Sequence, residues 1–305
     1  MNRWPPILVR LPAVWALLAC GTCLAEERET IQAPSIVSLA PFLTELVYAV
    51  GAGDRLLGAD RYSDYPPAAR AVPRIGDAWQ LDIERIVALR PSVVLAWTSG
   101  NAPAAVAQLR QLGLRVEFFD PQHLAEVAAA LERIGELTGR TAAGTARAAE
   151  FRAAVEALHR RYRGRQSLTV FYQVSRRPLF TLNGEHLVSE VLALCGGVNP
   201  FAALPARAPE IDVEALLAAD PEVIIAGSKD AVELEAWRAW DGLKAVRHGQ
   251  LYLIDPDLIV RQGPRLIQGI EQICTDLETA RAAYSRPPAL RQRANRQAKF
   301  MQQLG

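Results

Sequence analysis

The chain contains Asp82-Ile83-Glu84, six residues, and then Pro91-Ser92-Val93-Val94-Leu95-Ala96, and this stretch decides its fold because it recurs. The second copy is Asp212-Val213-Glu214, six residues, and then Pro221-Glu222-Val223-Ile224-Ile225-Ala226. Each copy predicts a short helix, because an N-cap Asp and a Glu in the first turn suit the exposed amides and the dipole of a helix start. The proline ends that helix, and the β-branched run after it predicts a buried strand. A helix–strand unit repeated after 130 residues predicts two similar α/β lobes.

The segments around each copy alternate between short apolar strands and helices. This alternation predicts a mostly parallel sheet covered by helices in each half. The expected fold is therefore two Rossmann-like lobes, at residues 35–139 and 167–285, each with its own core. Residues 140–164 are rich in Ala and Arg and contain no proline, so they predict one long connecting helix. A helical connection is stiff, and we expect only small closing movements of the lobes.

Residues 1–25 are typical of a secretory signal peptide, with early arginines, a short apolar core and small residues before Glu26. The apolar core is too short for a stable membrane span. The stretch Leu17-Leu18-Ala19-Cys20 also resembles a lipoprotein cleavage box, which would leave Cys20 as a lipid-bearing N-terminus. We expect an exported, soluble protein, because Leu18 fits that box poorly and cleavage there would leave Cys23 unpaired.

The charges of the chain nearly cancel, with 34 Lys and Arg against 33 Asp and Glu. This balance gives no electrostatic footprint for nucleic acid, so nucleic-acid binding is not expected. The tail at residues 286–305 carries five basic residues and no acid. We expect a disordered surface extension there, with contact to anionic lipid as the alternative.

Removal of the leader would leave two cysteines, Cys195 and Cys274. In an exported protein an isolated pair more often forms a disulfide than a catalytic site. A bridge across 79 residues would stabilise the fold by about 4–5 kcal/mol on the chain-entropy model. We therefore interpret the pair as structural.

Motifs of enzymes are missing from the sequence. It contains no Gly-x-Ser-x-Gly, no His-Glu-x-x-His and no phosphate-binding loop. The four histidines are not spaced like the ligands of a metal ion, and we expect all of them at the surface. They are His123, His159, His186 and His248. We predict neither catalytic nor metal-binding residues, and an extracytoplasmic metal-dependent hydrolase is the distant alternative.

Open α/β sheets bind ligands at the carboxyl ends of their strands. The predicted strands place there Pro41, Tyr62, Trp79 and Trp97 in the first lobe, and Phe180, Asp257 and Arg261 in the second. Aromatic side chains dominate this set, which suits a large, flat, conjugated ligand with neutral polar substituents. Core packing is the alternative for each aromatic residue, but it is weaker for Tyr62 and Trp97 because both lie in polar loops just beyond a strand.

The chain resembles the helical-backbone (class III) periplasmic substrate-binding proteins of ABC importers, and within that class the cobalamin-binding branch. The resemblance rests on Ser38-Leu39-Ala40-Pro41, Thr44-Glu45-Leu46, Tyr62-Ser63-Asp64-Tyr65-Pro66-Pro67, Glu84-Arg85-Ile86-Val87-Ala88-Leu89, Ala96-Trp97, Gly100-Asn101, Phe180-Thr181, Cys195-Gly196-Gly197, Asp257, Arg261 and Pro264-Arg265. It implies a monomeric receptor that captures cobalamin (vitamin B12) or a related corrinoid, without a resident cofactor. The receptor would deliver this ligand to the permease of an inner-membrane importer.

The resemblance also implies roles for individual residues. The seven residues at the strand ends would line the corrin, with Asp257 and Arg261 hydrogen-bonding the amides at its edge. Beyond their place in a helix terminus, Glu84 and Glu214 would dock on arginines of the permease. Cys195 and Cys274 would form the disulfide of the family.

Two features of the sequence leave alternative ligands to be tested. The chain has Ala208 where the family has a cleft tryptophan, which removes one large apolar contact and would suit another corrinoid. Haem or an iron siderophore is the alternative ligand, because several arginines would make the cleft basic and Tyr62 could serve as an axial residue.

Overall fold

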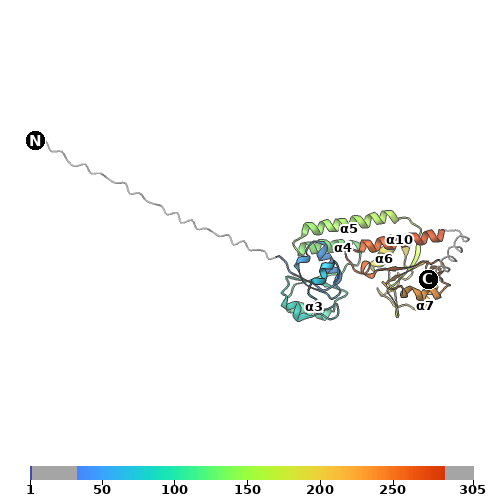
Figure 1. Cartoon of the computed structure of the whole chain (residues 1–305), viewed down its shortest axis with the longest axis horizontal. Coiled ribbons are helices and arrows are strands. Elements are labelled where there is room, and N and C mark those ends of the chain that lie inside the picture. Colours follow the sequence, from blue (N-terminus) through green and yellow to red (C-terminus); the bar gives the residue numbers. More distant parts are fainter. Residues whose placement is uncertain (2–32, 286–305) are drawn as a thin grey trace. The chain divides into compact units, whose positions relative to one another are not determined.

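The computed structural model describes Met1 and residues 33–285 of the chain (Figure 1). The predicted leader with Cys20 and the basic tail at 286–305 therefore lie outside the described residues. Within the described part of the chain, no helix has both the length and the apolar character needed to cross a membrane.

Both copies of the repeated stretch form the predicted helix. They are α2 (Ile83–Ala88) and α7 (Val213–Ala219). The side chains of Asp82 and Asp212 each accept a hydrogen bond from the amide three residues later, at 3.0 and 2.7 Å. The two predicted N-caps are thereby confirmed.

Each of these helices ends in the same way. Arg90 and Asp220 adopt left-handed backbone conformations, with φ of 47° and 38°, directly before the proline of each copy. This conformation ends the helical hydrogen-bond pattern before the proline is reached. The strands that follow are β3 (Val93–Trp97) and β9 (Val223–Gly227), both buried as predicted.

Each lobe contains a four-stranded, wholly parallel sheet. The first has the order β2-β1-β3-β4, with β1 Ile36–Ser38, β2 Leu56–Ala59 and β4 Val116–Phe119. The second has the order β8-β5-β9-β10, with β5 Leu168–Gln173, β8 Gly197–Val198 and β10 Leu251–Ile254. In both sheets the first strand lies between the second and the third, so the strand order reverses beside it. Such a reversal is where open sheets leave a crevice for a ligand.

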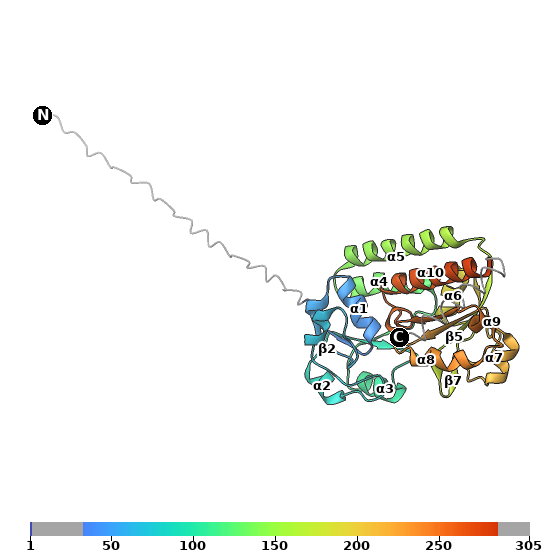
Figure 2. The same ribbon diagram turned by 45° about the vertical axis from the view of Figure 1, so that its right-hand side comes forward.

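The remaining elements cover the two sheets. The helices are α1 Pro41–Ala49, α3 Pro103–Gln111, α4 Leu124–Leu137, α5 Thr141–Tyr162, α6 Leu187–Leu194, α8 Val232–Glu235, α9 Lys244–Arg247 and α10 Leu266–Ser285. Short 3-10 turns occupy Gly53–Arg55, Pro67–Ala71, Ala236–Ala239 and Pro256–Leu258, and a small hairpin pairs β6 (Ser175–Arg176) with β7 (Leu179–Phe180). Helices α4, α5 and α10 lie along one side of the sheets, whereas α2, α3 and α7 lie along the other (Figure 2).

The expectation of a separate core in each lobe is wrong for the side covered by α5. One apolar cluster runs through both lobes and includes Leu43, Leu131, Phe151, Val188, Leu192 and Ile270. The lobes share this core because α5 packs on α4 of the first lobe and on α6 and α10 of the second. The opposite faces of the two sheets have separate clusters, under α2 and α3 in the first lobe and under α7 and α8 in the second.

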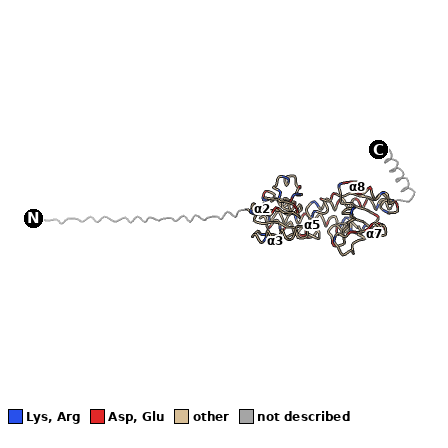
Figure 3. The backbone as a smooth tube through the Cα atoms, turned by 90° about the horizontal axis from the view of Figure 1, so that it is seen from below, with Lys and Arg blue, Asp and Glu red and all other residues tan. Residues whose placement is uncertain are grey.

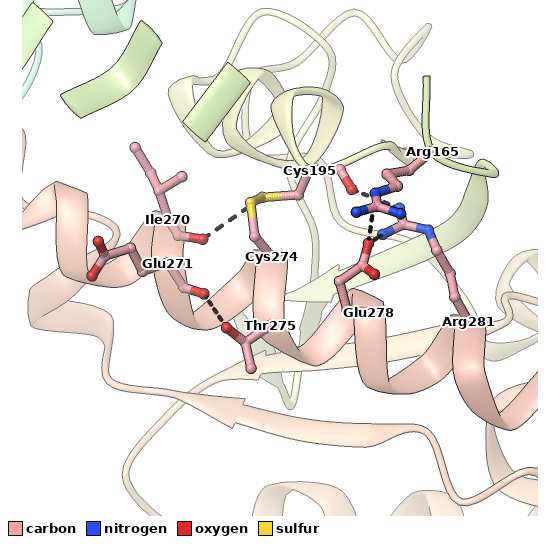
Figure 4. Close-up of a disulfide and its surroundings, with 8 residues drawn as sticks. All are labelled: Arg165, Cys195, Ile270, Glu271, Cys274, Thr275, Glu278 and Arg281. Carbon is pink, nitrogen blue, oxygen red and sulfur yellow. Dashed lines mark hydrogen bonds and ion pairs between the residues drawn. A yellow bond between two sulfur atoms is a disulfide. The ribbon is translucent and has the colours of Figure 1, made fainter. Parts of the chain in front are cut away.

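The two cysteines form a disulfide in the structure (Figure 4). Cys195 follows α6 and Cys274 lies within α10, both are fully buried, and their Cα atoms are 4.8 Å apart. Arg281 of α10 supports this junction by donating to the carbonyl of Cys195 at 2.6 Å and pairing with Glu278 at 2.8 Å. The end of α6 is thus held to α10 by a covalent bond and by a charged hydrogen bond.

Candidate functional site

The first lobe places two predicted ligand residues where its strand order reverses. Pro41 begins α1 just after β1, and Trp97 is the last residue of β3. The Asn101 side chain accepts from the Trp97 amide at 2.7 Å and donates to the carbonyl of Leu39 at 2.9 Å. It therefore holds the ends of the two neighbouring strands together. The indole of Trp97 donates to Asp120 at 3.0 Å, which fixes the direction of the ring.

Tyr62 and Trp79 stand on loops shaped by buried or half-buried aspartates. The carboxylate of Asp60 accepts from the Tyr62 amide at 2.8 Å, and that of Asp77 accepts from the Trp79 amide at 3.1 Å. Tyr62 is 59% exposed and Trp79 79% exposed. Core packing is excluded for both rings, since neither is covered by the protein.

Main-chain hydrogen bonds join these loops. The Arg61 amide donates to the carbonyl of Gly76 at 2.7 Å, and the Ala102 amide donates to the carbonyl of Ala78 at 3.0 Å. The first bond connects the Tyr62 loop with the Trp79 loop, and the second connects the Trp79 loop with the segment after Trp97. The aromatic residues predicted for the first lobe therefore come from loops that lie side by side.

The second lobe places its predicted residues on two separate segments. Asp257 lies in the turn after β10, where it pairs with Arg261 at 2.8 Å and with Lys229 at 2.7 Å. Phe180 is half-buried at the end of the β6–β7 hairpin, and among the described rings it pairs with no other aromatic residue. Ala208 is exposed in the loop before α7.

Arg261 reaches from the second lobe to the first. Its Nη1 donates to Asp64 at 2.7 Å and to Glu45 at 3.2 Å, and its Nη2 donates to the carbonyl of Tyr62 at 3.4 Å. Arg265 donates to the same Glu45 carboxylate at 2.6 and 2.9 Å. Sequence reasoning assigned no role to Glu45, Asp64 or Arg265. The available signal was that Glu45 is the one acid in the apolar helix at 41–49.

The charges of this group stabilise one another. Burial alone would lower the pKa of Arg261, but hydrogen bonds and charges from Asp64, Asp257 and Glu45 outweigh it and raise the pKa. Burial alone would raise the pKa of Asp64, but the hydrogen bond and charge of Arg261 outweigh it and lower the pKa. Both groups are therefore ionised at neutral pH, and the charged side chains at this edge of the site are paired with one another.

The buried Asp60 behaves differently. Burial raises the pKa of its carboxyl from 3.8 to about 6, against the lowering effect of the Tyr62 amide. The neighbouring Asp77 raises this pKa further, while Arg74 and Arg261 lower it. A carboxyl group that loses its proton near pH 6 thus supports the loop that presents Tyr62.

We expect Asp60→Asn to stabilise the protein at pH 7.5 by about 1–3 kcal/mol and to leave its stability unchanged at pH 4. Between pH 4 and 6 the folded state holds a proton that the unfolded state has lost. The free energy of unfolding of the wild type therefore falls as pH rises through this window, and the neutral amide removes that fall. Urea unfolding at both pH values measures the difference. The control is Asp54→Asn, at an exposed carboxylate of the same lobe, and an equal effect of Asp60→Asn at both pH values would contradict the prediction.

Two histidines differ from the surface position predicted for them. His186 is half-buried and caps α6, and burial together with Arg207 lowers its pKa to about 4. His248 is also half-buried, with its ring 4.5 Å from that of Tyr284. The other two histidines are exposed as predicted. In the part of the chain that the structure describes, no group of three or more His, Cys, Asp or Glu is placed to hold a metal ion.

A pocket of about 490 Å³ lies where α1, α5 and α10 meet. Glu45, Tyr65, Phe151 and Arg265 form part of its wall, but none of the predicted ligand residues does. It therefore adjoins the ion pairs between the lobes on the side of the connecting helix, whereas the aromatic residues stand at the carboxyl ends of the strands.

Glu84 and Glu214 occupy matching positions on the other side of the protein. Each is exposed in the first turn of its helix, α2 or α7. Neither makes an ion pair or a side-chain hydrogen bond with another described residue. Acidic and basic residues are interspersed along the backbone of both lobes (Figure 3).

Comparisons with known proteins agree with this architecture. The sequence profile of the periplasmic binding protein family matches residues 36–258. A vitamin B12-binding protein of Vibrio cholerae is 36% identical over 275 residues, which cover 90% of this chain and 99% of that protein. The crystal structure of the periplasmic vitamin B12-binding protein of Vibrio cholerae matches with a TM-score of 0.77 and 37% identity, over 82% of this chain and 98% of that one.

A more distant solved structure supports the fold alone. The periplasmic heme-binding protein of Vibrio cholerae has a TM-score of 0.70 at 19% identity, over 80% of this chain and 98% of that one. The predicted fold class, two α/β lobes with parallel sheets joined by a long helix, is confirmed. The chain belongs to the periplasmic binding protein family.

Proposed function

We propose that this protein captures cobalamin or a related corrinoid between the lobes at 35–139 and 167–285 and delivers it to an inner-membrane ABC importer. One observation carries the proposal: exposed aromatic rings from joined loops stand at the carboxyl ends of parallel strands, beside the ion-paired side chains of Asp257 and Arg261. A corrin is broad, largely apolar on its faces and fringed by neutral amides, so it complements such a surface. The vitamin B12-binding relatives, which match over nearly their whole length, support the same ligand.

In this proposal the ligand contacts Pro41, Tyr62, Trp79 and Trp97 on one side and Phe180, Asp257 and Arg261 on the other. The aromatic rings exclude water from the corrin faces. Asp257 and Arg261 supply an acceptor and a donor for the amides at its edge. Cobalamin is cargo rather than a cofactor, and the protein makes and breaks no bond.

Calorimetric titration with cyanocobalamin and with cobinamide tests this function. We expect both to bind, since both carry the corrin ring and its amides. Haem is titrated in parallel, because the exposed Tyr62 could ligate its iron and would then give a shifted Soret band. Binding of haem without binding of either corrinoid would overturn the proposed ligand and favour the haem alternative.

We further propose that Glu84 and Glu214 dock on arginines of the permease. The two acids occupy the same place in a repeated unit, so a two-fold symmetric partner could contact both in the same way. The double variant Glu84→Gln with Glu214→Gln should bind cyanocobalamin like the wild type but deliver it about tenfold more slowly, because charge pairs at an interface steer association.

Uptake of labelled cobalamin by cells that carry only the variant measures this delivery. Glu156→Gln on α5 removes an exposed acid from the opposite side of the protein and is the matched control. Normal uptake with the double variant, or an equal loss with the control, would remove these two acids from the docking surface.

We also propose that the protein is a monomer in the periplasm, freed from its leader by cleavage before Glu26. The mass of the exported protein distinguishes this form from one that is acylated at Cys20. A mass that includes an acyl group on Cys20 would show that the receptor is anchored in the membrane and would overturn the proposed soluble form.

A further inference from the structure

One buried carboxylate accepts hydrogen bonds from two arginines in the contact between the lobes. The side chain of Glu45, in α1 of the first lobe, is 2% exposed. It accepts three hydrogen bonds, from Nη1 of Arg261 at 3.2 Å and from Nη2 and Nε of Arg265 at 2.6 and 2.9 Å. Both arginines belong to the segment that leads into α10 of the second lobe.

Further groups of the first lobe hold the same arginines. Arg261 also donates to Asp64 at 2.7 Å, and the guanidinium of Arg265 lies 4.1 Å from the centre of the Tyr65 ring. Within its own lobe, Arg261 pairs with Asp257 at 2.8 Å. Both η nitrogens of Arg261 are thus engaged, and among the described residues its Nε is the nitrogen without a partner.

This arrangement makes the contact between the lobes sensitive to a single residue. A buried charge is tolerated when it is paired and hydrogen-bonded, and removing its partner leaves that charge uncompensated. Any separation of the lobes at this point would expose the Glu45 carboxylate without its two cations. The same contacts set the direction in which Arg261 presents Nε.

We propose that Glu45 is a positioning residue: from the first lobe it fixes the segment of Arg261 and Arg265 in the second, and thereby sets the orientation of Arg261 toward the ligand. The second part rests on the proposed function, because it assumes that Arg261 hydrogen-bonds the cargo. The first part concerns the protein alone.

The test uses Glu45→Gln, which keeps the shape of the side chain and removes its charge. Hydrogen–deuterium exchange is measured on the ligand-free protein, and cyanocobalamin affinity is measured by calorimetry, both well below the unfolding temperature. We expect amides at residues 258–266 to exchange at least about tenfold faster, with strands β3 and β9 unchanged. Affinity for cyanocobalamin should fall by about tenfold.

The matched control is Glu150→Gln on α5. Glu150 lines the same pocket but is exposed and pairs only with Arg147 of its own helix. This variant should leave both exchange and affinity unchanged. A purely structural role for Glu45 would instead accelerate exchange throughout both lobes, in step with the loss of stability.

Wild-type exchange at 258–266 in Glu45→Gln would overturn the first part of the proposal, and faster exchange with unchanged affinity would overturn the second. If the wild type binds no corrinoid, the proposed function fails, and the exchange comparison still decides whether Glu45 holds the two arginines. Should Glu45→Gln not fold, Glu45→Asp keeps the charge but shortens its reach, and the same two measurements apply.

Discussion

Replacing both Cys195 and Cys274 with alanine is expected to lower the free energy of unfolding by about 4–5 kcal/mol and the unfolding midpoint by roughly 10–20 °C. The bridge spans 79 residues, and without it the unfolded chain regains conformational entropy. Both side chains are fully buried, so the lost sulfurs also leave small cavities that add to the destabilisation. Thermal and urea unfolding of the variant measure the change.

Wild-type protein in a thiol reductant is the matched control for this variant. Reduction should remove most of the same stability from the wild type, which then stays slightly above the double variant because its thiols still fill the core, and should not affect the variant itself. Arg281 holds the end of α6 to α10 independently of the bridge. A loss below about 1 kcal/mol would therefore show that noncovalent contacts such as this one are sufficient.

Replacing Trp97 with alanine is expected to weaken cyanocobalamin binding by about 30- to 1,000-fold, or about 2–4 kcal/mol. Trp97 stands where the strand order of the first lobe reverses. Its indole is held by Asp120 at 3.0 Å and packs edge-on against Phe42, with ring centres 5.9 Å apart. A ring that is already fixed loses little freedom on binding, so most of its contact energy contributes to affinity. Calorimetric titration of the folded variant measures the loss.

Leu112→Ala provides the control for Trp97→Ala. Leu112 is a large exposed apolar residue of the same lobe, at the end of α3 that points away from the carboxyl edge of the sheet. Its removal should leave affinity unchanged. Trp97→Phe, which keeps a ring without the Asp120 bond, should fall between wild type and alanine. Unchanged affinity of Trp97→Ala would exclude Trp97 from the ligand site.

The elements with strong local signals could be predicted from the sequence. Asp82 and Asp212 cap their helices because an N-cap depends only on the next few residues. The shared core under α5 could not be predicted, since it depends on how distant segments pack, as when Leu131 and Val188 enter one cluster.

The candidate site also contains some residues that local sequence predicts and others that it does not. Tyr62 could be predicted at an exposed edge because polar turn residues surround it in the sequence. Trp97 was expected there for the same reason but is half-buried and packs against the core, whereas Trp79, for which core packing stayed open, is exposed. The pairing of Glu45 with Arg265 bridges 220 positions, and no local pattern encodes it. His186 was misplaced because a histidine in a polar turn gives no sign that it will cap a helix and be half-buried.

The shared core also limits what an importer could sense. Because α4, α5, α6 and α10 contribute to one apolar core, the two lobes should move little relative to each other. Glu84 and Glu214 would then keep nearly the same separation in empty and filled receptors. A transporter that contacts both acids would then meet the same docking surface in the empty and the filled receptor. Receptors without ligand would compete with loaded receptors for the same site on the transporter. The transporter would then have to distinguish the two forms by the ligand itself or by their dissociation rates.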